Sequence, residues 1–200
     1  MRYTGPNNKK SRRYKISILE NNKEFLKGKK RITAPGDHGA RAQKLSNFGE
    51  HLYEKQKLRF IYGLSEKQLK RTFEKAKKMR GVLGENFLFL LESRLDNIVY
   101  RAGLANTRRQ ARQIVNHGHI LVNNKKIDIP SYQVKVGDRF SIRTKLTNNI
   151  FVLNSLEKRR TNDFVVFDEK IMMGEYVRLP RRDEIVGQVN ESLVVEFYNK

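Results

Sequence analysis

The sequence contains no cysteine. This absence excludes disulfide bonds, thiolate zinc sites and cysteine nucleophiles together. Long hydrophobic runs are also missing. The longest, Phe87–Leu91, is far shorter than the roughly 20 residues that span a membrane, and Met1–Lys10 lacks the apolar core of a signal peptide. We therefore expect a soluble protein of the cytoplasm.

Acidic residues are scarce relative to basic ones. The 200 residues include 42 Lys and Arg but only 21 Asp and Glu, which gives a net charge of +21. An excess of this size repels itself and is best explained by a polyanionic partner. Residues 1–50, 51–92 and 93–145 carry +9, +5 and +8, whereas 146–200 carries −1. We therefore expect the polyanion to contact the first three quarters of the chain, and the last quarter to pack or to meet protein.

A membrane surface is a weaker explanation of the charge, because no long amphipathic helix with an aromatic face is present. Enzyme signatures are missing as well. The glycines form neither a phosphate-binding loop nor a dinucleotide fingerprint, the acidic residues are scattered, and no serine triad can be argued. His117 and His119 form an H-x-H pair without an obvious third ligand, so we expect no metal or other cofactor. The chain is predicted not to be an enzyme.

Residues 1–45 show no sustained hydrophobic periodicity, and turn signals such as Gly5-Pro6 and Pro35-Gly36 interrupt them. They carry two basic runs, at 9–13 and 29–31. Two interpretations stay open. The segment is either a solvated, disordered tail or an arm that becomes ordered on nucleic acid, where phosphate contacts replace a hydrophobic core.

Helical patterns begin at Ser46. Residues 46–62 are predicted to form one helix that ends at Gly63, and Ser65 with Gln68 has the capping-box spacing that starts a second helix. The apolar face of this second helix is predicted to consist of Leu69, Phe73, Ala76 and Met79. The remaining surface is mainly basic. We interpret it as an RNA contact rather than as a merely solvated face.

Residues 85–101 are predicted to form a single apolar helix at the centre of the fold, ended by Gly103. Asn106 or Thr107 caps the next helix, because Thr107 and Gln110 repeat the capping-box spacing. On that helix the basic residues are Arg108, Arg109 and Arg112, and the opposite arc holds Ala111, Ile114 and Val115. This pattern predicts an outward arginine edge on a helix whose other side is anchored.

The pattern becomes extended after Gly118. Asn123-Asn124 is predicted to form a tight turn, because Asn tolerates positive φ. Strands are predicted over 119–122, 125–127, 132–136, 139–143, 164–167, 175–179 and 193–198, with a weakly patterned helix at 147–160. The predicted fold class is therefore α+β, with a basic N-terminal arm, a helical domain and an inserted α+β RNA-binding domain that contains an antiparallel sheet.

The helix–Gly–helix pattern of residues 88–116 also resembles a DNA-reading helix-turn-helix. However, the basic charge extends over about 145 residues, which suits a folded RNA with junctions better than a straight duplex. Two other classes stay open from the residues alone. One is a stand-alone RNA-binding regulator of mRNA or tRNA, and the other is an RNA-modifying enzyme, for which no room is left for a catalytic domain.

The string RLDNIVYRAGLANTRRQARQIVNHGHILVNNKKIDIPSYQVKVGD, at 94–138, resembles the S-four RNA-binding module. Its flanks resemble the bacterial-type small-subunit ribosomal protein four family. They are MRYTGPNNKKSRR at 1–13, APGDHGAR at 34–41, LSNFGEHLYEKQKLRFIYG at 45–63, GENFLFLLESRLDN at 84–97 and NESLVVEFYNK at 190–200. The match covers nearly the whole chain in order.

This resemblance implies a primary rRNA-binding protein that docks on the five-way junction of the small-subunit rRNA 5′ domain and nucleates assembly of the subunit body. It implies a basic arm at 1–45, a helical domain at 46–92 completed by about 189–200, and an α+β domain at 93–188 that contains the module at about 93–145. Many relatives carry a four-cysteine zinc site in the arm. This chain has none, so its arm is expected to fold without metal.

The resemblance further implies a place in the ribosome, of the cytoplasm or of an organelle. The implied neighbours are ribosomal proteins five and three, at a surface tied to decoding accuracy, and mRNA at the entry channel, which Arg41 and Lys44 would face. Some members of the family repress their own operon.

The residues predicted to contact RNA are the basic side chains of these segments together with a few aromatic and polar ones. They are Arg2, Tyr3, Lys9, Lys10, Arg12, Arg13, Lys29, Lys30, Arg31, Arg41, Lys44, Lys55, Lys57, Arg59, Tyr62, Lys70, Arg71, Lys77, Lys78, Arg94, Arg101, Thr107, Arg108, Arg109, Arg112, His117, His119, Asn123, Lys125 and Lys126.

Overall fold

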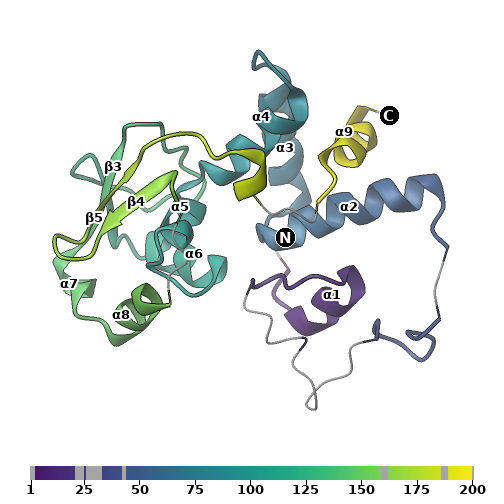
Figure 1. The fold of residues 1–200 in the computed structure, drawn as a ribbon, viewed down its shortest axis with the longest axis horizontal. Coiled ribbons are helices and arrows are strands. Elements are labelled where there is room, and N and C mark those ends of the chain that lie inside the picture. The colour runs from purple at the N-terminus through teal and green to yellow at the C-terminus, as the bar shows by residue number, and fades with distance from the viewer. Residues whose placement is uncertain are drawn as a thin grey trace. The chain divides into compact units, whose positions relative to one another are not determined.

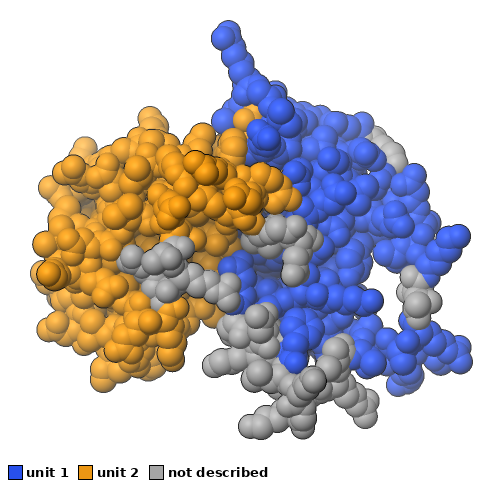
Figure 2. Space-filling view, viewed as in Figure 1, with its two compact units in different colours: residues 1–85, 188–200 blue, residues 86–187 orange. Residues whose placement is uncertain are grey.

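A computed structural model of the chain describes residues 3–20, 25, 33–41, 44–158, 162–185 and 189–199. Helices and an antiparallel sheet are both present, so the predicted α+β class is confirmed (Figure 1). The chain divides into two compact units, coloured blue and orange in Figure 2. Unit 1 consists of residues 1–85 and 188–200, and unit 2 consists of residues 86–187.

Unit 1 is helical and contains α1 (Asn7–Tyr14), α2 (Asn47–Ile61), α3 (Glu66–Lys77) and α9 (Glu191–Asn199). The predicted starts of α2 and α3 are confirmed. The Ser46 side chain accepts a hydrogen bond from the Gly49 N–H, and Ser65 with Gln68 forms a reciprocal capping box. Such caps satisfy backbone N–H groups that have no partner within the helix.

The N-terminal residues pack more than the sequence suggested. The pattern of residues 1–45 predicted no helix, yet Asn7–Tyr14 form α1, and Tyr14, Ile16 and Ile18 are buried. The Tyr14 ring lies 4.8 Å from the Tyr53 ring of α2, and the Tyr53 hydroxyl donates to the Arg13 carbonyl over 2.8 Å. A solvated tail is therefore the wrong description of residues 3–18, because this short helix buries aromatic surface against α2.

The strand predicted over residues 193–198 is wrong, since these residues belong to helix α9. Val194 is fully buried, the Phe197 ring lies 5.7 Å from Phe48, and the Tyr198 ring lies 4.7 Å from Phe73. These three residues follow helical i, i+3, i+4 spacing. Packing of this face in unit 1 outweighs the strand preference of the adjacent Val194 and Val195, because intrinsic propensity is a weak determinant.

The single helix predicted over residues 85–101 is also wrong. The structure has two helices there, α4 (Leu83–Glu92) and α5 (Leu95–Arg101), separated by Arg94 with an extended backbone at φ −68° and ψ 138°. The break occurs because residues 93–95 pair with an extended segment instead. The Val134 N–H donates to the Ser93 carbonyl and the Leu95 N–H to the Tyr132 carbonyl, both over 2.8 Å.

The predicted strand at 132–136 is reduced to this contact, an isolated antiparallel bridge between Arg94 and Gln133. The other predicted strands of unit 2 exist. Most ends shift by one residue, but the strand predicted over 175–179 shares only residues 175 and 176 with the observed one. They are β1 (Ile120–Val122), β2 (Lys125–Lys126), β3 (Arg139–Ile142), β4 (Val165–Asp168) and β5 (Met173–Tyr176). The five strands form one antiparallel sheet in the order β2-β1-β3-β5-β4.

The turn between β1 and β2 is the one that the sequence predicts. Asn123 and Asn124 have φ values of 48° and 64°, the conformation of a two-residue hairpin turn. The Asn123 side chain also donates to Asp138 Oδ1 over 2.8 Å and accepts from the Arg139 N–H over 3.0 Å. The hairpin is therefore tied to the start of β3.

Helices α5 and α6 (Arg108–Asn116) contribute to the unit 2 core, together with Val152 and Leu156 of a later helix. The buried face predicted for α6 is confirmed, with Ala111, Ile114 and Val115 in the core. Residues 147–160 were predicted to be weakly helical, and they contain α8 (Ile150–Glu157), preceded by α7 (Thr144–Thr147). A short 3-10 helix, η2 (Arg182–Glu184), follows β5.

Candidate nucleic-acid interface

The structure sorts the predicted RNA contacts by exposure. The exposed ones, which a polyanion can reach directly, are Lys9, Arg13, Arg41, Lys44, Lys70, Arg71, Lys77, Lys78, His117, Asn123, Lys125 and Lys126. Those of intermediate exposure are Tyr3, Lys10, Arg12, Arg59, Arg101, Thr107, Arg109 and His119. Arg2, Lys29, Lys30 and Arg31 lie outside the described residues.

Six predicted contacts are buried, which the sequence did not anticipate. They are Lys55, Lys57, Tyr62, Arg94, Arg108 and Arg112. Each of the two lysines is paired with a carboxylate, Lys55 with Glu66 over 2.8 Å and Lys57 with Glu54 over 3.1 Å. Tyr62 is 2% exposed, so its ring is part of the core and is not available to stack on a base. The charges of the two buried lysines are therefore compensated by carboxylates within the protein.

Helix α3 presents the clearest basic face of unit 1. Leu69, Phe73 and Ala76 are buried as predicted, but Met79 is 44% exposed because α3 ends at Lys77 and the helical face does not continue. The exposed positions of α3 and its C-cap include Lys67, Lys70, Arg71, Lys75, Lys77 and Lys78. These side chains form a cationic surface that can neutralise several phosphates.

An aromatic and cationic cluster lies where α1 meets α2. The Tyr3 and Phe60 rings lie 5.3 Å apart, and Lys10 Nζ lies 5.1 Å and 4.7 Å from their centroids. Burial, followed by the nearby Arg13 and Arg59, lowers the pKa of Lys10. The half-exposed rings and several close cations can contribute both stacking and charge to RNA binding.

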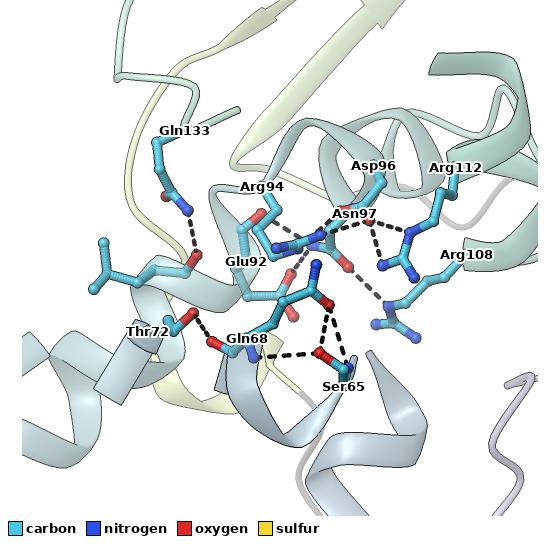
Figure 3. Close-up of polar contacts among 11 residues, drawn as sticks. Ser65, Gln68, Thr72, Glu92, Arg94, Asp96, Asn97, Arg108, Arg112 and Gln133 are labelled. Carbon is cyan, nitrogen blue, oxygen red and sulfur yellow. Dashed lines mark hydrogen bonds and ion pairs between the residues drawn. The ribbon is translucent and has the colours of Figure 1, made fainter. Parts of the chain in front are cut away.

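In unit 2 arginine side chains bind two buried carboxylates, those of Asp96 and Glu92. Figure 3 shows Asp96 with Arg94 and Arg112. Asp96, whose side chain is 4% exposed, accepts from Arg94 Nε over 3.0 Å and Arg94 Nη2 over 2.9 Å. It also accepts from Arg112 Nε over 2.8 Å and from Arg112 Nη2. One carboxylate therefore holds two guanidinium groups and joins the start of α5 to α6.

Glu92, whose side chain is fully buried, binds Arg101 through two hydrogen bonds of 2.9 Å. It also accepts from Asn97 Nδ2 over 2.7 Å, and Asn97 Oδ1 accepts from Arg108 Nε over 2.8 Å. The Arg108 guanidinium lies over the Tyr100 ring, with its Cζ 4.6 Å from the ring centroid. The predicted outward arginine edge is therefore wrong for Arg108 and Arg112, because the amide of Asn97 and the carboxylate of Asp96, both in α5, bind them inside the unit.

Arg109 is the member of that edge that keeps intermediate exposure. It lies in the first turn of α6, which Thr107 caps by accepting from the Gln110 N–H over 3.2 Å, while the Gln110 side chain accepts from the Asn106 N–H. The buried network fixes this helix from the inside. Of the three arginines predicted for this edge, Arg109 is therefore the one with a partly exposed side chain.

Unit 2 has a basic surface where α6 ends. Here the structure adds Arg143 and Lys145, which the sequence-based list omitted, to the predicted His117, His119 and Lys126. The sequence signal for the two was only the high basic content of residues 93–145. Among the described residues, no group of three His, Cys, Asp or Glu side chains could hold a metal ion.

None of the helices in the described ranges combines the length and hydrophobicity of a membrane-crossing segment. Residues 2–92 match the family model described as the ribosomal protein S4/S9 N-terminal domain, and residues 93–140 match the S4 domain. The sequence is 56% identical over 202 residues to small ribosomal subunit protein uS4 of Mycoplasma capricolum, with 100% of this chain and 97% of that protein covered. The proteins of the same name from Mesoplasma florum and Acholeplasma laidlawii are 55% and 53% identical, with all of this chain and 98% and 99% of theirs covered.

Proposed function

The chain belongs to the uS4 family of ribosomal proteins, and we propose from this premise that it is an RNA-binding structural component of the small ribosomal subunit. The family membership bears out the resemblance seen in the sequence and the prediction that the chain is not an enzyme. An RNA-modifying enzyme with this module would need a further catalytic domain, whereas the match to these relatives covers the whole chain.

The observation that carries the proposal is the distribution of uncompensated positive charge. The chain has a net charge of +21. Exposed cations lie on α1, on α3 and around the β1–β2 hairpin, and Arg41 and Lys44 are two more. Surfaces of this kind bind RNA by neutralising phosphates and releasing counterions. A folded rRNA can present phosphates to several of these surfaces at once.

The finer proposal is that the chain binds the 5′-domain junction of the small-subunit rRNA early and nucleates assembly of the subunit body. In this proposal the arm at 1–45 and the helical domain at 46–92, completed by 189–200, share the RNA with the α+β domain at 93–188. Arg41 and Lys44 face mRNA at the entry channel. Ribosomal proteins five and three are the neighbours, and the surface shared with protein five influences decoding accuracy.

The test is to ask whether the protein sediments with small ribosomal subunits and protects the 5′-domain junction from chemical probes. Free protein without affinity for that RNA would refute the proposal. A matched pair of variants then locates the surface. K77Q/K78Q removes two exposed cations at the end of α3, and K158Q/K170Q removes two exposed cations from the near-neutral last quarter.

We expect K77Q/K78Q to weaken binding and to reduce the slope of log affinity against log salt concentration by roughly 0.7–0.9 per lost phosphate contact. K158Q/K170Q should leave both quantities unchanged. Equal effects of the two pairs would mean that net charge alone, and not the α3 surface, sets the affinity.

A further inference from the structure

Five basic side chains from different elements of unit 2 converge where α6 ends and the hairpin begins. His117 is the C-cap of α6, Lys126 lies in β2, and Lys145 lies in α7; the other two are His119 and Arg143. The centroids of the two imidazole rings lie 6.1 Å apart. The backbone N–H of Arg143 donates to the backbone carbonyl of His119 over 2.9 Å. We call these five residues the His119 cluster.

Gly118 brings Lys126 close to the two histidines. Its φ is +67°, and a Cβ built on it would lie 2.2 Å from Lys126 Cε and 2.9 Å from Nζ. The lysine side chain therefore crosses the backbone between His117 and His119 and lies close to Gly118. Lys126 is also one of the cations near enough to His119 to act on its imidazole electrostatically.

No member of the His119 cluster pairs with a carboxylate in the part of the chain that the structure describes. Three other arginines of unit 2 do pair with carboxylates, since Arg94 binds Asp96, Arg101 binds Glu92 and Arg139 binds Glu175. The histidine at the centre is half-buried, and the other four members are exposed. The charges that surround His119 in the free protein are thus all positive.

Burial and the neighbouring positive groups change the pKa of the His119 imidazole. Burial, followed by His117, Arg143, Lys126 and Lys145, lowers the pKa of His119 below its ordinary value of 6.5. Both causes favour the neutral imidazole in the free protein. A nearby anion would act in the opposite direction, because it stabilises the imidazolium form.

We propose that the His119 cluster binds one phosphate group of the RNA backbone, and that His119 takes up a proton from solvent when RNA occupies it. The proposal rests on the function proposed above and adds a titrating contact to it. A single negative charge among five basic groups offsets their mutual repulsion and makes the imidazolium favourable. No covalent bond changes, and the proton comes from the buffer.

The sign of the pH dependence follows directly. Because RNA raises the pKa of His119, the affinity increases as the pH falls from the bound pKa to the free pKa, and it levels off below that. Each unit of difference between these two pKa values corresponds to about a tenfold gain in affinity.

The experiment measures binding of the full chain to an rRNA 5′-domain transcript between pH 5.5 and 7.5 at constant ionic strength. It compares the wild type with H119N, which cannot titrate, and with H38N, which removes an exposed histidine of another segment. We expect about a tenfold rise in affinity towards low pH for the wild type and H38N, and at most a twofold rise for H119N. Circular dichroism verifies that H119N is folded.

A second measurement follows the Hε1 resonance of His119 by NMR titration, alone, with the transcript and with inorganic phosphate. RNA should move the midpoint upward. If inorganic phosphate shifts it but RNA does not, the cluster is a site for free anions and the RNA assignment is overturned. If RNA binds and H119N keeps the full pH dependence, the proposal is wrong while the proposed function stands. If no variant binds the transcript at any pH, the proposed function itself fails.

Discussion

The buried carboxylate of Asp96 makes a sharp test of how unit 2 is stabilised. Substituting Asp96→Asn removes the charge but keeps the size of the side chain. The wild-type carboxylate accepts four hydrogen bonds from Arg94 and Arg112. Both arginines are buried, with 4% and 9% of their surface exposed. The amide of Asn keeps one acceptor oxygen and points an N–H group at donors. Two buried guanidinium groups are left without a counter-charge.

Breaking a buried ion pair by removing one partner costs about 3–5 kcal/mol. The free energy of unfolding of a domain is about 5–15 kcal/mol, so this loss leaves unit 2 marginally stable. We expect D96N to lower the urea midpoint strongly. The matched control is D128N, because Asp128 is exposed in the same unit and has no such network, and it should change the stability by less than about 0.5 kcal/mol.

The assay is urea unfolding followed by far-ultraviolet circular dichroism, with hydrogen exchange of residues 95–122 to assign the loss to unit 2. A D96N variant no less stable than D128N would refute the reasoning. The triple variant R94M/D96L/R112M separates charge pairing from packing. Replacing a whole buried ionic cluster by apolar groups is commonly neutral or stabilising, so it should recover most of the loss. It should also keep the salt dependence of RNA binding, because Arg94 and Arg112 are buried against Asp96 rather than exposed to a ligand.

Three further predictions concern other contacts. Arg109→Gln alone should reduce the log–log salt slope of RNA binding by roughly 0.7–0.9, one phosphate contact, and an unchanged slope would show that Arg109 is merely solvated. The Arg178 guanidinium, which hydrogen-bonds to Glu184, lowers the pKa of that carboxyl to about 2. Its contribution to stability is therefore present above the unfolded value near 4.5 and is lost as the pH falls towards 2. Glu184→Gln should be less stable than wild type by about 1 kcal/mol at pH 6, and chemical denaturation should show the gap narrowing at pH 3; a gap that is constant with pH would contradict this assignment. Tyr198→Phe removes the hydroxyl that donates to Glu66 Oε1 over 2.9 Å and should lower the free energy of unfolding by about 1 kcal/mol, whereas no change in the urea midpoint would mean that ring packing alone holds α9.

Local chemistry explains the elements that the sequence predicted correctly. Ser65 and Gln68 cap α3 within four residues, and Asn123-Asn124 adopt positive φ because their side chains tolerate that conformation. The buried face of α3 follows from helical periodicity alone, up to the point where the helix ends. Interactions within a few residues determine each of these features, so the local sequence is sufficient to predict them.

The incorrect predictions of secondary structure have a different origin. The break between α4 and α5 depends on backbone hydrogen bonds to residues 132–134, about 40 positions along the chain. Helix α9 forms where strand propensity is high, because its apolar face packs on Phe48 and Phe73. In both cases contacts from distant segments decide the conformation, and no local pattern announces them.

The sequence by itself determined that this is a basic RNA-binding protein, and which segments carry the charge. Only the tertiary structure decided which cations are available to the RNA. Asp96 and Arg112 lie 16 residues apart, and the cluster around His119 brings together residues of α6, β2 and α7, so pairing between charges cannot be inferred from composition. The physical reason is that a guanidinium has the same charge whether it faces water or a buried carboxylate. The fold alone sets which counter-charge each one meets.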